Sequence, residues 1–274
     1  MVRFYKYKHR HPYDDYLQSI WALTNDEGIS REPIISDGFP EILFLIRGAV
    51  KIIIGTDIHQ IESHTFIGLF DKSAFFELDP DTIILSFKLM PWMTSNVICD
   101  QAHLVKNQII PLDDLGYKRS LLDFSYSKKF DSMDALISHI ISKELPQILN
   151  LNGRIPSALL MDMLSQFNSL QTLSASDRKM GSSRYFEKLY RTHVGISPMR
   201  YKRLLKIKKS SLILAESQSV KIEPLALALG YYDLSHFYKD FSLFTDTTPN
   251  EFRSNCRQSI LLEDNDYVNQ YLYS

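Results

Sequence analysis

Residues 222–252 read IEPLALALGYYDLSHFYKDFSLFTDTTPNEF, a stretch that predicts a helix–turn–helix. Its first helix is marked by apolar residues at helical spacing, which are Ile222, Leu225, Ala226 and Leu229. Gly230 ends that helix, and Asp233 is placed to cap a second one, in which Phe237 and Phe241 face inward one turn apart. The side chains left outside on this second helix are Leu234, Ser235, His236 and Lys239. A short helix of this kind has the size that enters a DNA major groove.

An earlier stretch, residues 171–201, contains a second version of the pattern. Ser182 is placed as a cap, RYFEKLYR (184–191) follows as a helix, and Gly-Ile-Ser-Pro (195–198) ends the unit. Phe186 and Tyr190 form the inward pair of this helix. The outward side chains are Arg184, Glu187, Lys188 and Arg191.

Between the two units, MRYKRLLKIKKSSLIL (199–214) has the composition of a strongly basic helix. Residues 166–258 hold 15 lysines and arginines against 8 acidic residues, a net charge of +7, whereas the rest of the chain holds 16 against 24, a net charge of −8. A basic run in isolation indicates no more than a solvated face. Joined to two helix–turn–helix patterns, it indicates a polyanion as the partner.

Two such units joined by a helix resemble the AraC/XylS family of bacterial transcription regulators. The resemblance spans residues 171–258, and its most specific part is Gly-Tyr-Tyr-Asp-Leu-Ser-His-Phe at 230–237. Phe241, Thr248-Pro249 and Phe252-Arg253 continue that pattern. In the first unit the match runs from Ser182 to Pro198, and residues 174–181 (SASDRKMG) depart from the family's apolar first helix.

The resemblance implies which side chains contact DNA. Base-reading positions fall on Arg184, Glu187 and Lys188 in the first unit and on Leu234, Ser235 and Lys239 in the second. The further DNA contacts are predicted at Ser183, Arg191, Lys202, Arg203 and His236. Arg184 suits a guanine edge, whereas Lys188 and Arg191 suit phosphates. Glu187 either accepts from a cytosine amino group or pairs with a neighbouring arginine. We therefore expect more base specificity from the first unit and more anchoring from the second.

The partner implied is double-stranded DNA, bound in the major groove. RNA polymerase, a small-molecule effector and a second copy of the chain are the further partners that the resemblance allows, and no cofactor is expected. Tyr231 and Tyr232 lie in the turn of the second unit, where either could face the core or reach a phosphate. The other aromatic residues of the two units, including Tyr185, repeat at helical spacing and are expected in the core.

The amino-terminal part contains apolar runs typical of strands. EILFLI (41–46), a turn at Arg47-Gly48 and AVKIII (49–54) predict a hairpin, and further strands are expected at 82–89 and 96–99. Trp21, the stretch from Ser36 to Phe44 and the block from Leu85 to Leu115 resemble an uncharacterised domain that precedes the DNA-binding region in a subset of the family. That resemblance implies a β-barrel that senses a ligand or forms dimers.

We therefore expect an α+β protein with a β-rich, barrel-like amino-terminal domain and an all-α DNA-binding domain. The predicted boundaries are 1–127 for the first domain, 128–170 for a helical linker, 171–258 for the DNA-binding domain and 259–274 for an acidic tail. The linker carries an apolar stripe over 133–148 behind a cap at Asp131 or Ser132, with Pro146 placed to kink it. The stripe is interpreted either as a dimer contact or as packing on the chain's own barrel.

Other classes of protein receive little support. Cys99 and Cys256 are far apart, which argues against a disulfide scaffold or a cysteine-ligated zinc site. His59, Glu62 and His64 could suggest a metal site, but strand alternation separates the two histidines, so an exposed hairpin turn is expected there.

The amino terminus does not read as a signal peptide, and no run is long enough to cross a bilayer, so we expect a cytoplasmic, nucleoid-associated protein with no membrane partner and no enzymatic activity. Two rival functions remain. One is an architectural or adaptor DNA-binding protein without an effector, and the other is a metal-dependent barrel enzyme fused to a DNA-binding region.

Overall fold

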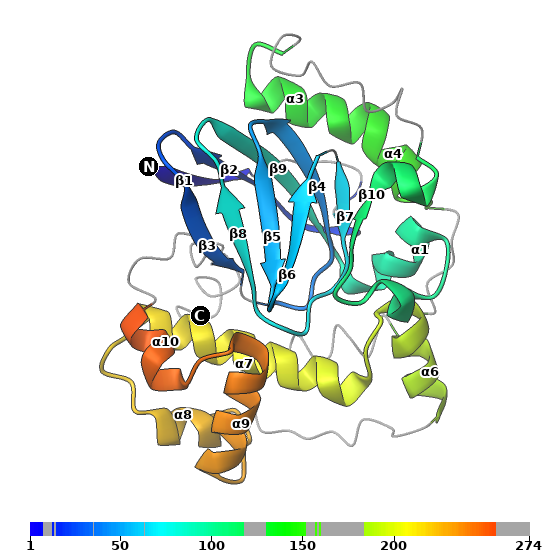
Figure 1. The fold of residues 1–274 in the computed structure, drawn as a ribbon. Coiled ribbons are helices and arrows are strands. Elements are labelled where there is room, and N and C mark those ends of the chain that lie inside the picture. Colours follow the sequence, from blue (N-terminus) through cyan, green and yellow to red (C-terminus); the bar gives the residue numbers. More distant parts are fainter. Residues whose placement is uncertain are drawn as a thin grey trace.

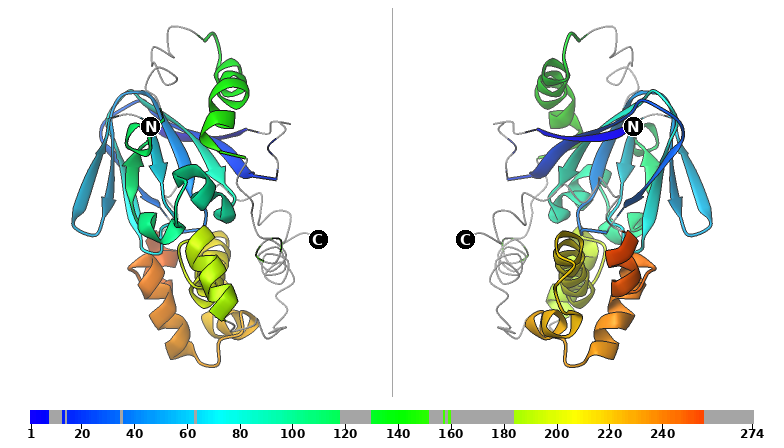
Figure 2. Two further views of the ribbon diagram at one scale, coloured as in Figure 1. Left: turned by 90° about the vertical axis from the view of Figure 1, so that its right-hand side faces the viewer. Right: turned by 90° about the vertical axis from the view of Figure 1, so that its left-hand side faces the viewer.

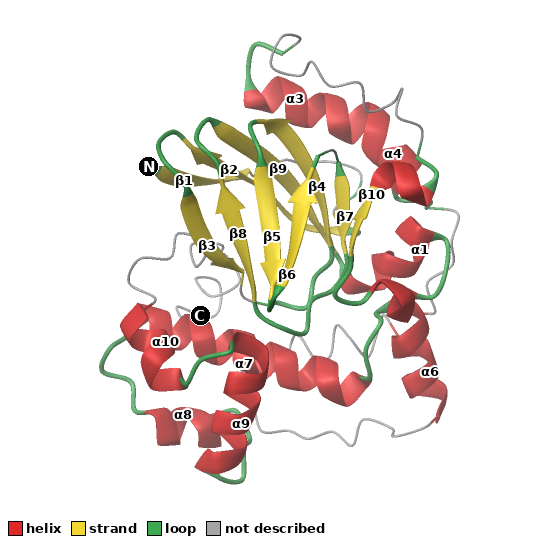
Figure 3. Cartoon of the chain, in the orientation of Figure 1, coloured by secondary structure: helices red, strands yellow, loops and turns green. Residues whose placement is uncertain are grey.

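The computed structural model describes residues 1–7, 13, 15–34, 36–62, 64–117, 130–151, 157, 159 and 184–255. Its strands form two antiparallel sheets (Figure 3). The larger sheet has the order β1 (Val2–Tyr7), β2 (Leu17–Asn25), β9 (Thr82–Leu89), β4 (Glu41–Arg47), β7 (Thr65–Ile67) and β10 (Ile109–Pro111). The smaller sheet has the order β3 (Ser30–Ile34), β8 (Ala74–Leu78), β5 (Val50–Ile54) and β6 (Asp57–Ile61). The β-rich amino-terminal region expected from the sequence is confirmed.

Alternate side chains along a strand point to opposite sides of a sheet, and in the six-stranded sheet both sets contain buried apolar residues. One set, with Trp21, Leu43 and Ile84, packs against Ile52 and Phe76 of the smaller sheet. The other set packs against helices, and its larger members are Ile20, Ile42, Phe44, Phe66, Leu85 and Phe87. The sheet thus forms a middle layer with apolar packing above and below.

The helices that cover this second face follow β9 in the chain. The first are the short turns η1 (Pro91–Met93), α1 (Thr94–Ile98), η2 (Ala102–Val105) and η3 (Leu112–Leu115). The linker supplies the others, which are α3 (Met133–His139), the π-helical segment η5 (Ile140–Glu144) and α4 (Leu145–Ile148). Figure 1 shows α3 and α4 at the opposite end of the sheet from the helices of the carboxyl-terminal half.

The linker helix begins where the sequence places its cap, since the Ser132 hydroxyl accepts a hydrogen bond from the Ala135 amide. The wide turn at 140–144 lies directly before Pro146, which has no amide hydrogen and would crowd the carbonyl of a regular helix. The apolar stripe, including Ile137 and Leu145, is buried in the chain's own core. Packing on its own sheet, and not a dimer contact, is therefore the use of this stripe.

The carboxyl-terminal half consists of helices arranged around a long central one. They are α6 (Arg184–His193), α7 (Pro198–Glu216), α8 (Ile222–Ala228), α9 (Leu234–Thr245) and α10 (Pro249–Asn255). The sheets lie on one side of α7, while α8 and α9 extend from the other side (Figure 2). α6 stands at the beginning of α7, so the bridging helix predicted at 199–214 joins two helical units as expected.

The predicted hairpin of 41–46 with 49–54 is wrong. β4 pairs with β9 and β7, whereas β5 pairs with β6 and β8 in the other sheet. The chain crosses between sheets at Gly48, where φ is +80° and a side chain would meet Thr82. The Thr82 hydroxyl holds this crossing by donating to the Ala49 carbonyl and accepting from its amide. Local alternation cannot distinguish such a crossing from a tight hairpin.

Two other expectations are also wrong. Residues 96–99 are not a strand but the end of helix α1, which stops at Cys99 in a left-handed conformation, because a short apolar run fits either structure. His64 does not lie in an exposed turn, since it is 1% exposed and its ring packs on Phe44 with centroids 4.6 Å apart. Burial lowers the pKa of His64 well below its ordinary value.

Several expectations fall outside the described residues. These are the cap at Ser182, the contact at Ser183, the first helix of the first unit and the acidic tail from 259. The domain boundaries at 127, 170 and 258 stay predictions.

The sheet crossing generates a first prediction. In Gly48→Ala the new methyl carbon would lie 2.5 Å from Thr82 Oγ1 and 2.6 Å from its Cα. Together with the left-handed backbone, this overlap should lower the free energy of unfolding by about 2–5 kcal/mol. Gly55→Ala is the matched control, because Gly55 has φ +62° and open space around it, so it should cost only about 1–2 kcal/mol. Urea unfolding measures both, and equal losses would contradict the crossing.

Candidate DNA-binding surface

The second unit folds as its sequence predicts. Leu225 and Ala226 form the buried side of α8, Leu229 at its end is also buried, and Gly230 follows with φ +75°. The Asp233 carboxylate caps α9 by accepting from the His236 amide at 2.7 Å. At the far end, Asp246 ends the helix in a left-handed conformation, as expected of a residue that tolerates it.

The outward side chains of α9 are exposed. They are Leu234, Ser235, His236 and Lys239, while Phe237 and Phe241 are fully buried on the opposite side. The turn before the helix divides its two tyrosines, since Tyr231 is 4% exposed and Tyr232 is 93% exposed. Tyr232 therefore joins the outward surface, and Tyr231 belongs to the core.

The first unit presents α6 in the same way. Tyr190 is fully buried and Phe186 half-buried, whereas the outward residues Arg184, Glu187, Lys188 and Arg191 are all exposed. Tyr185 was expected in the core, but it is 56% exposed and lies edge-on to Phe186. Its exposure shows that the expected core position of Tyr185 is wrong. The DNA contacts of these side chains stay predictions.

The bridging helix α7 differs from the open basic face expected of it. All its residues are described, and only Met199 and Glu216 near its ends are exposed. Arg200 pairs with an aspartate of the strand region, and the Lys206 ammonium lies 5.2 Å from the centre of the Tyr231 ring. Lys202 and Arg203, two predicted DNA contacts, are each half-buried. Much of the basic charge of this helix is thus held within the fold.

Arg203 has an acidic partner inside the protein. Asp240, in the middle of α9, is 1% exposed, and the Arg203 guanidinium donates to both of its carboxylate oxygens, with Nε 2.8 Å from Oδ2. The Tyr231 hydroxyl donates to the same carboxylate at 3.1 Å. Burial and the Asp240 charge raise the pKa of Tyr231 above its usual range. The carboxylate therefore ties α7, the turn and α9 together.

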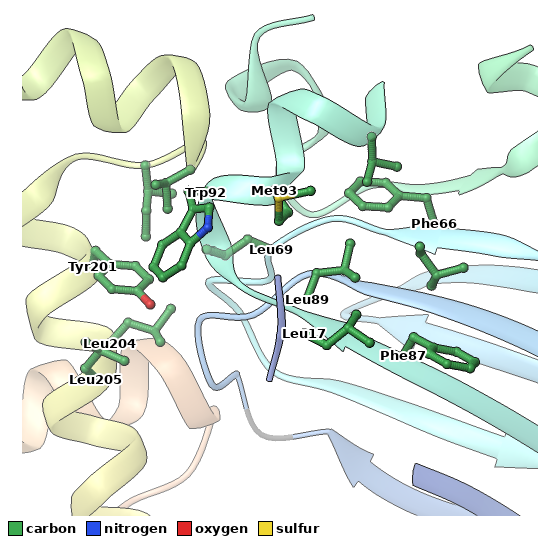
Figure 4. Packing of buried hydrophobic residues seen from close by; sticks show 14 of the residues in the cluster. Leu17, Phe66, Leu69, Phe87, Leu89, Trp92, Met93, Tyr201, Leu204 and Leu205 are labelled. Carbon is green, nitrogen blue, oxygen red and sulfur yellow. The ribbon is translucent and has the colours of Figure 1, made fainter. Parts of the chain in front are cut away.

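An apolar contact joins the helices to the strands. Trp92 and Met93, which follow β9, pack beside Tyr201, Leu204 and Leu205 of α7 (Figure 4). Trp92 is 3% exposed, and Tyr201 and Leu204 are fully buried. Gly38 permits this closeness, since a Cβ there would lie 3.0 Å from the Tyr201 ring. The core of the β-rich region continues without a break into the helical half.

A buried carboxylate reinforces the same contact. Asp71, in the loop between β7 and β8, is 0% exposed, accepts from Asn107 Nδ2 at 2.7 Å and pairs with Arg200 and Lys106. Burial alone would raise the pKa of Asp71, but the Asn107 hydrogen bond and the two cations outweigh it, so the pKa is lowered. The Arg200 guanidinium also lies over the Phe244 ring, 5.4 Å from its centre, so it touches α9 as well.

Both α6 and α9 are attached to the amino-terminal region by hydrogen bonds. At α9, the Ser73 hydroxyl donates to Asp246. At α6, Ser95 Oγ is hydrogen-bonded to His193 Nδ1 at 2.8 Å, and burial lowers the pKa of His193. Gly195 lets the chain approach closely, since a Cβ there would lie 2.9 Å from the Ala102 carbonyl oxygen. The amino-terminal region thus holds both units at once.

The described part of the chain contains no group of side chains arranged to bind a metal ion. Within those residues, no three histidine, cysteine or acidic side chains are grouped to hold a metal ion. His59 lies in β6 opposite Ile52, away from the buried His64. The described residues also include no helix that is both long and apolar enough to cross a bilayer.

Comparison with known protein families identifies the helical half. Residues 178–255 match a family described as a helix-turn-helix domain. They are an AraC-type helix–turn–helix domain. The match covers α6 to α10, so the AraC-type domain contains both outward helices and the bridge between them.

Among solved structures, the similar ones include ToxT from Vibrio cholerae. A structure of ToxT from strain O395 has 11% sequence identity and a TM-score of 0.45, covering 94% of this chain and 98% of that one. A second, in the P21 form, has 10% identity and a TM-score of 0.43, covering 93% and 97%. A third, with bound unsaturated fatty acid, has 12% identity and a TM-score of 0.41, covering 92% and 94%. These likenesses are too distant to carry an argument. No curated protein sequence matches the chain.

Two residues important to the AraC-type domain were not predicted. Asp240 had a visible signal, because it lies on the inward stripe formed by Phe237, Phe241 and Phe244, where a carboxylate needs a partner. Asp71 had none, since its partner Arg200 is 129 residues away in the chain.

The Asp71 contact generates a second prediction. Asp71→Asn should lower the free energy of unfolding at pH 7 by about 1.5–3 kcal/mol, the range for hydrogen bonds to charged groups. A lowered native pKa means that the carboxylate stabilises the fold above its unfolded pKa of about 3.9. That contribution is lost as the pH falls through the lowered native value, so the two proteins should converge in acid. Equilibrium unfolding from pH 7 down to pH 2, which extends below the unfolded pKa, follows this convergence.

The control for this measurement is Asp57→Asn, which changes an exposed carboxylate in β6. Its difference from the wild type should stay small at every pH. A constant gap for Asp71→Asn across the whole range would show that the ion pair contributes nothing.

Proposed function

We propose that this protein is a sequence-specific DNA-binding transcription regulator, controlled through its amino-terminal region. The observation that supports this most is the pair of helices α6 and α9 in the AraC-type domain, each with aromatic residues packed on one side and exposed polar and basic residues on the other. Each helix would enter one of two successive major grooves, about 34 Å apart along the duplex.

The two helices would do different work. α6 exposes Arg184, Glu187 and Lys188, which can form hydrogen bonds with base edges and phosphates. α9 exposes Leu234, which suits a thymine methyl group, and Lys239, whose ammonium group suits a phosphate. Base specificity would therefore come more from α6, and anchoring more from α9. Tyr232, fully presented to solvent, adds a hydroxyl group that can donate to a phosphate.

Control would act through the contacts that attach both units to the strand region. Asp71 with Arg200, Ser73 with Asp246, and Ser95 with His193 lie between them. A change in the strand region that loosens one contact and keeps another would alter the spacing or freedom of the two recognition helices. A small-molecule effector or a second copy of the chain could cause it.

A cavity at this junction is the proposed effector site. Its walls include the rings of Trp21, Phe70 and Phe76. The charged groups are Asp37, Glu41 and Lys88 from the strand region and Lys208 of α7. Lys88 Nζ lies 2.6 Å from Asp37 and 3.6 Å from Glu41, so one ammonium group faces two carboxylates beside the aromatic wall. Because Phe70 precedes Asp71 and Lys208 belongs to α7, a bound molecule would press on the interface itself.

The proposal is tested by incubating the full-length protein with sheared genomic DNA and sequencing the retained fragments at moderate salt. One motif with two blocks about one helical turn apart would support a sequence-specific regulator. Uniform retention that fades with salt would favour an architectural protein instead. No retention, with and without a panel of cell metabolites, would contradict DNA binding.

The division of labour gives a third prediction. Arg184→Ala should lose about 1–3 kcal/mol of discrimination at one base pair, because a guanine edge loses two hydrogen bonds. Lys239→Ala should weaken binding to all sequences alike and reduce the salt slope by about 1. Titrations of the selected motif and its single-base variants over a series of salt concentrations separate the two effects. The same pattern for both variants would refute the division.

A further inference from the structure

The second recognition helix is held to α7 by a buried ion pair as well as by apolar packing. Phe237 and Phe241 supply the packing, and Asp240 lies on the same inward side. A carboxylate that is 1% exposed destabilises the fold unless it is fully paired. Its presence among three buried phenylalanines therefore calls for a role that another apolar residue would not fill.

The geometry of the pair is directional. Arg203 donates from Nε and Nη2 to the two oxygens of Asp240, an arrangement in which both planar groups must face each other. Aromatic packing alone allows a helix to turn or slide by small amounts, whereas a two-pronged pair to a neighbouring helix does not. The Tyr231 hydroxyl, 3.1 Å from Oδ2, fixes the turn before α9 to the same group.

The outward face of α9 is connected to this pair through His236. His236 lies one helical turn before Asp240, with Nε2 3.8 Å from Oδ1 and its ring edge-on to Tyr231 at 5.2 Å. Because residues on a helix keep fixed angles to one another, the direction of Asp240 determines that of Leu234, Ser235 and Lys239. Rotation of α9 about its axis would aim all of them at different bases.

We propose that the Asp240–Arg203 pair sets the orientation of the second recognition helix, and that Arg203 is a positioning residue and not a DNA contact. The proposal rests on the proposed function only for its effect on base selectivity. The orientation itself is a property of the free protein. The pair contributes to selectivity more than to stability, because buried ion pairs are often replaceable by apolar residues without loss of stability.

The test compares two variants with the wild type. One is Asp240→Asn, and the other is a double variant that carries both Arg203→Met and Asp240→Leu and so fills the site with apolar groups. The matched control is Lys51→Met with Glu77→Leu, which removes an ion pair of 2.7 Å between β5 and β8. Full-length proteins select from a random duplex library, and bound sequences are read. Both Asp240 variants should lose about tenfold discrimination in the block read by α9 and none in the block read by α6, while the control keeps both.

Two outcomes would overturn the proposal. If the double variant is as stable as the wild type and equally selective in both blocks, the pair does not orient the helix. If Arg203→Met alone weakens binding to all sequences and lowers the salt slope by about 1, while Asp240→Asn binds more tightly, Arg203 is a phosphate contact.

Hydrogen exchange of the free proteins keeps the test independent of DNA. The amides of α9 should exchange faster in both Asp240 variants, with those of α6 unchanged. If the wild type selects no motif, the proposed function fails, but the exchange rates still decide the orientation. Unchanged exchange in α9 would refute it.

Discussion

The packing of α7 against the loops and the η1 turn at one end of the strands is the constraint on which the rest of the structure depends. The helices after β9, together with α3 and α4, cover the second face of the sheet, and α7 closes the apolar core at the end of the strands nearest the helical half. Trp92 and Met93 extend that apolar surface to Tyr201, Leu204 and Leu205. The same helix that joins the two DNA-binding units therefore also closes the core of the amino-terminal region.

This double use explains where the charges go. The helical region carries a net positive charge and the rest of the chain a net negative one, and this asymmetry indicates a nucleic-acid partner for the helical region. In the folded chain part of that attraction is internal, since Arg200 meets Asp71 and Arg203 meets Asp240. Attraction toward a polyanion is left largely to the exposed ends of the fold, α6 and the outward side of α9.

Local patterns predicted much of this architecture. Caps at Ser132 and Asp233, the end of α8 at Gly230 and the long bridging helix all depend on residues close in sequence, so they could be read directly. Pairing between distant segments could not. The crossing at Gly48 looks like a hairpin, and the Asp71–Arg200 pair joins residues 129 apart. At the candidate DNA-binding surface, the exposed faces of α6 and α9 could be predicted from the sequence. The ion pair between Arg203 and Asp240 could not, because it depends on how α7 and α9 pack.

The position of α7 between the two halves also bears on how such a chain can be divided. A fragment that ends the amino-terminal region before α7 would leave Trp92 and the sheet beneath it open to water, and the helical fragment would expose Tyr201, Leu204 and Leu205. Each piece would carry a large apolar patch of the kind that drives self-association. The two halves differ in composition and in charge, yet they share one apolar core. Exchange of either half with another protein would demand matching residues on both sides of this junction.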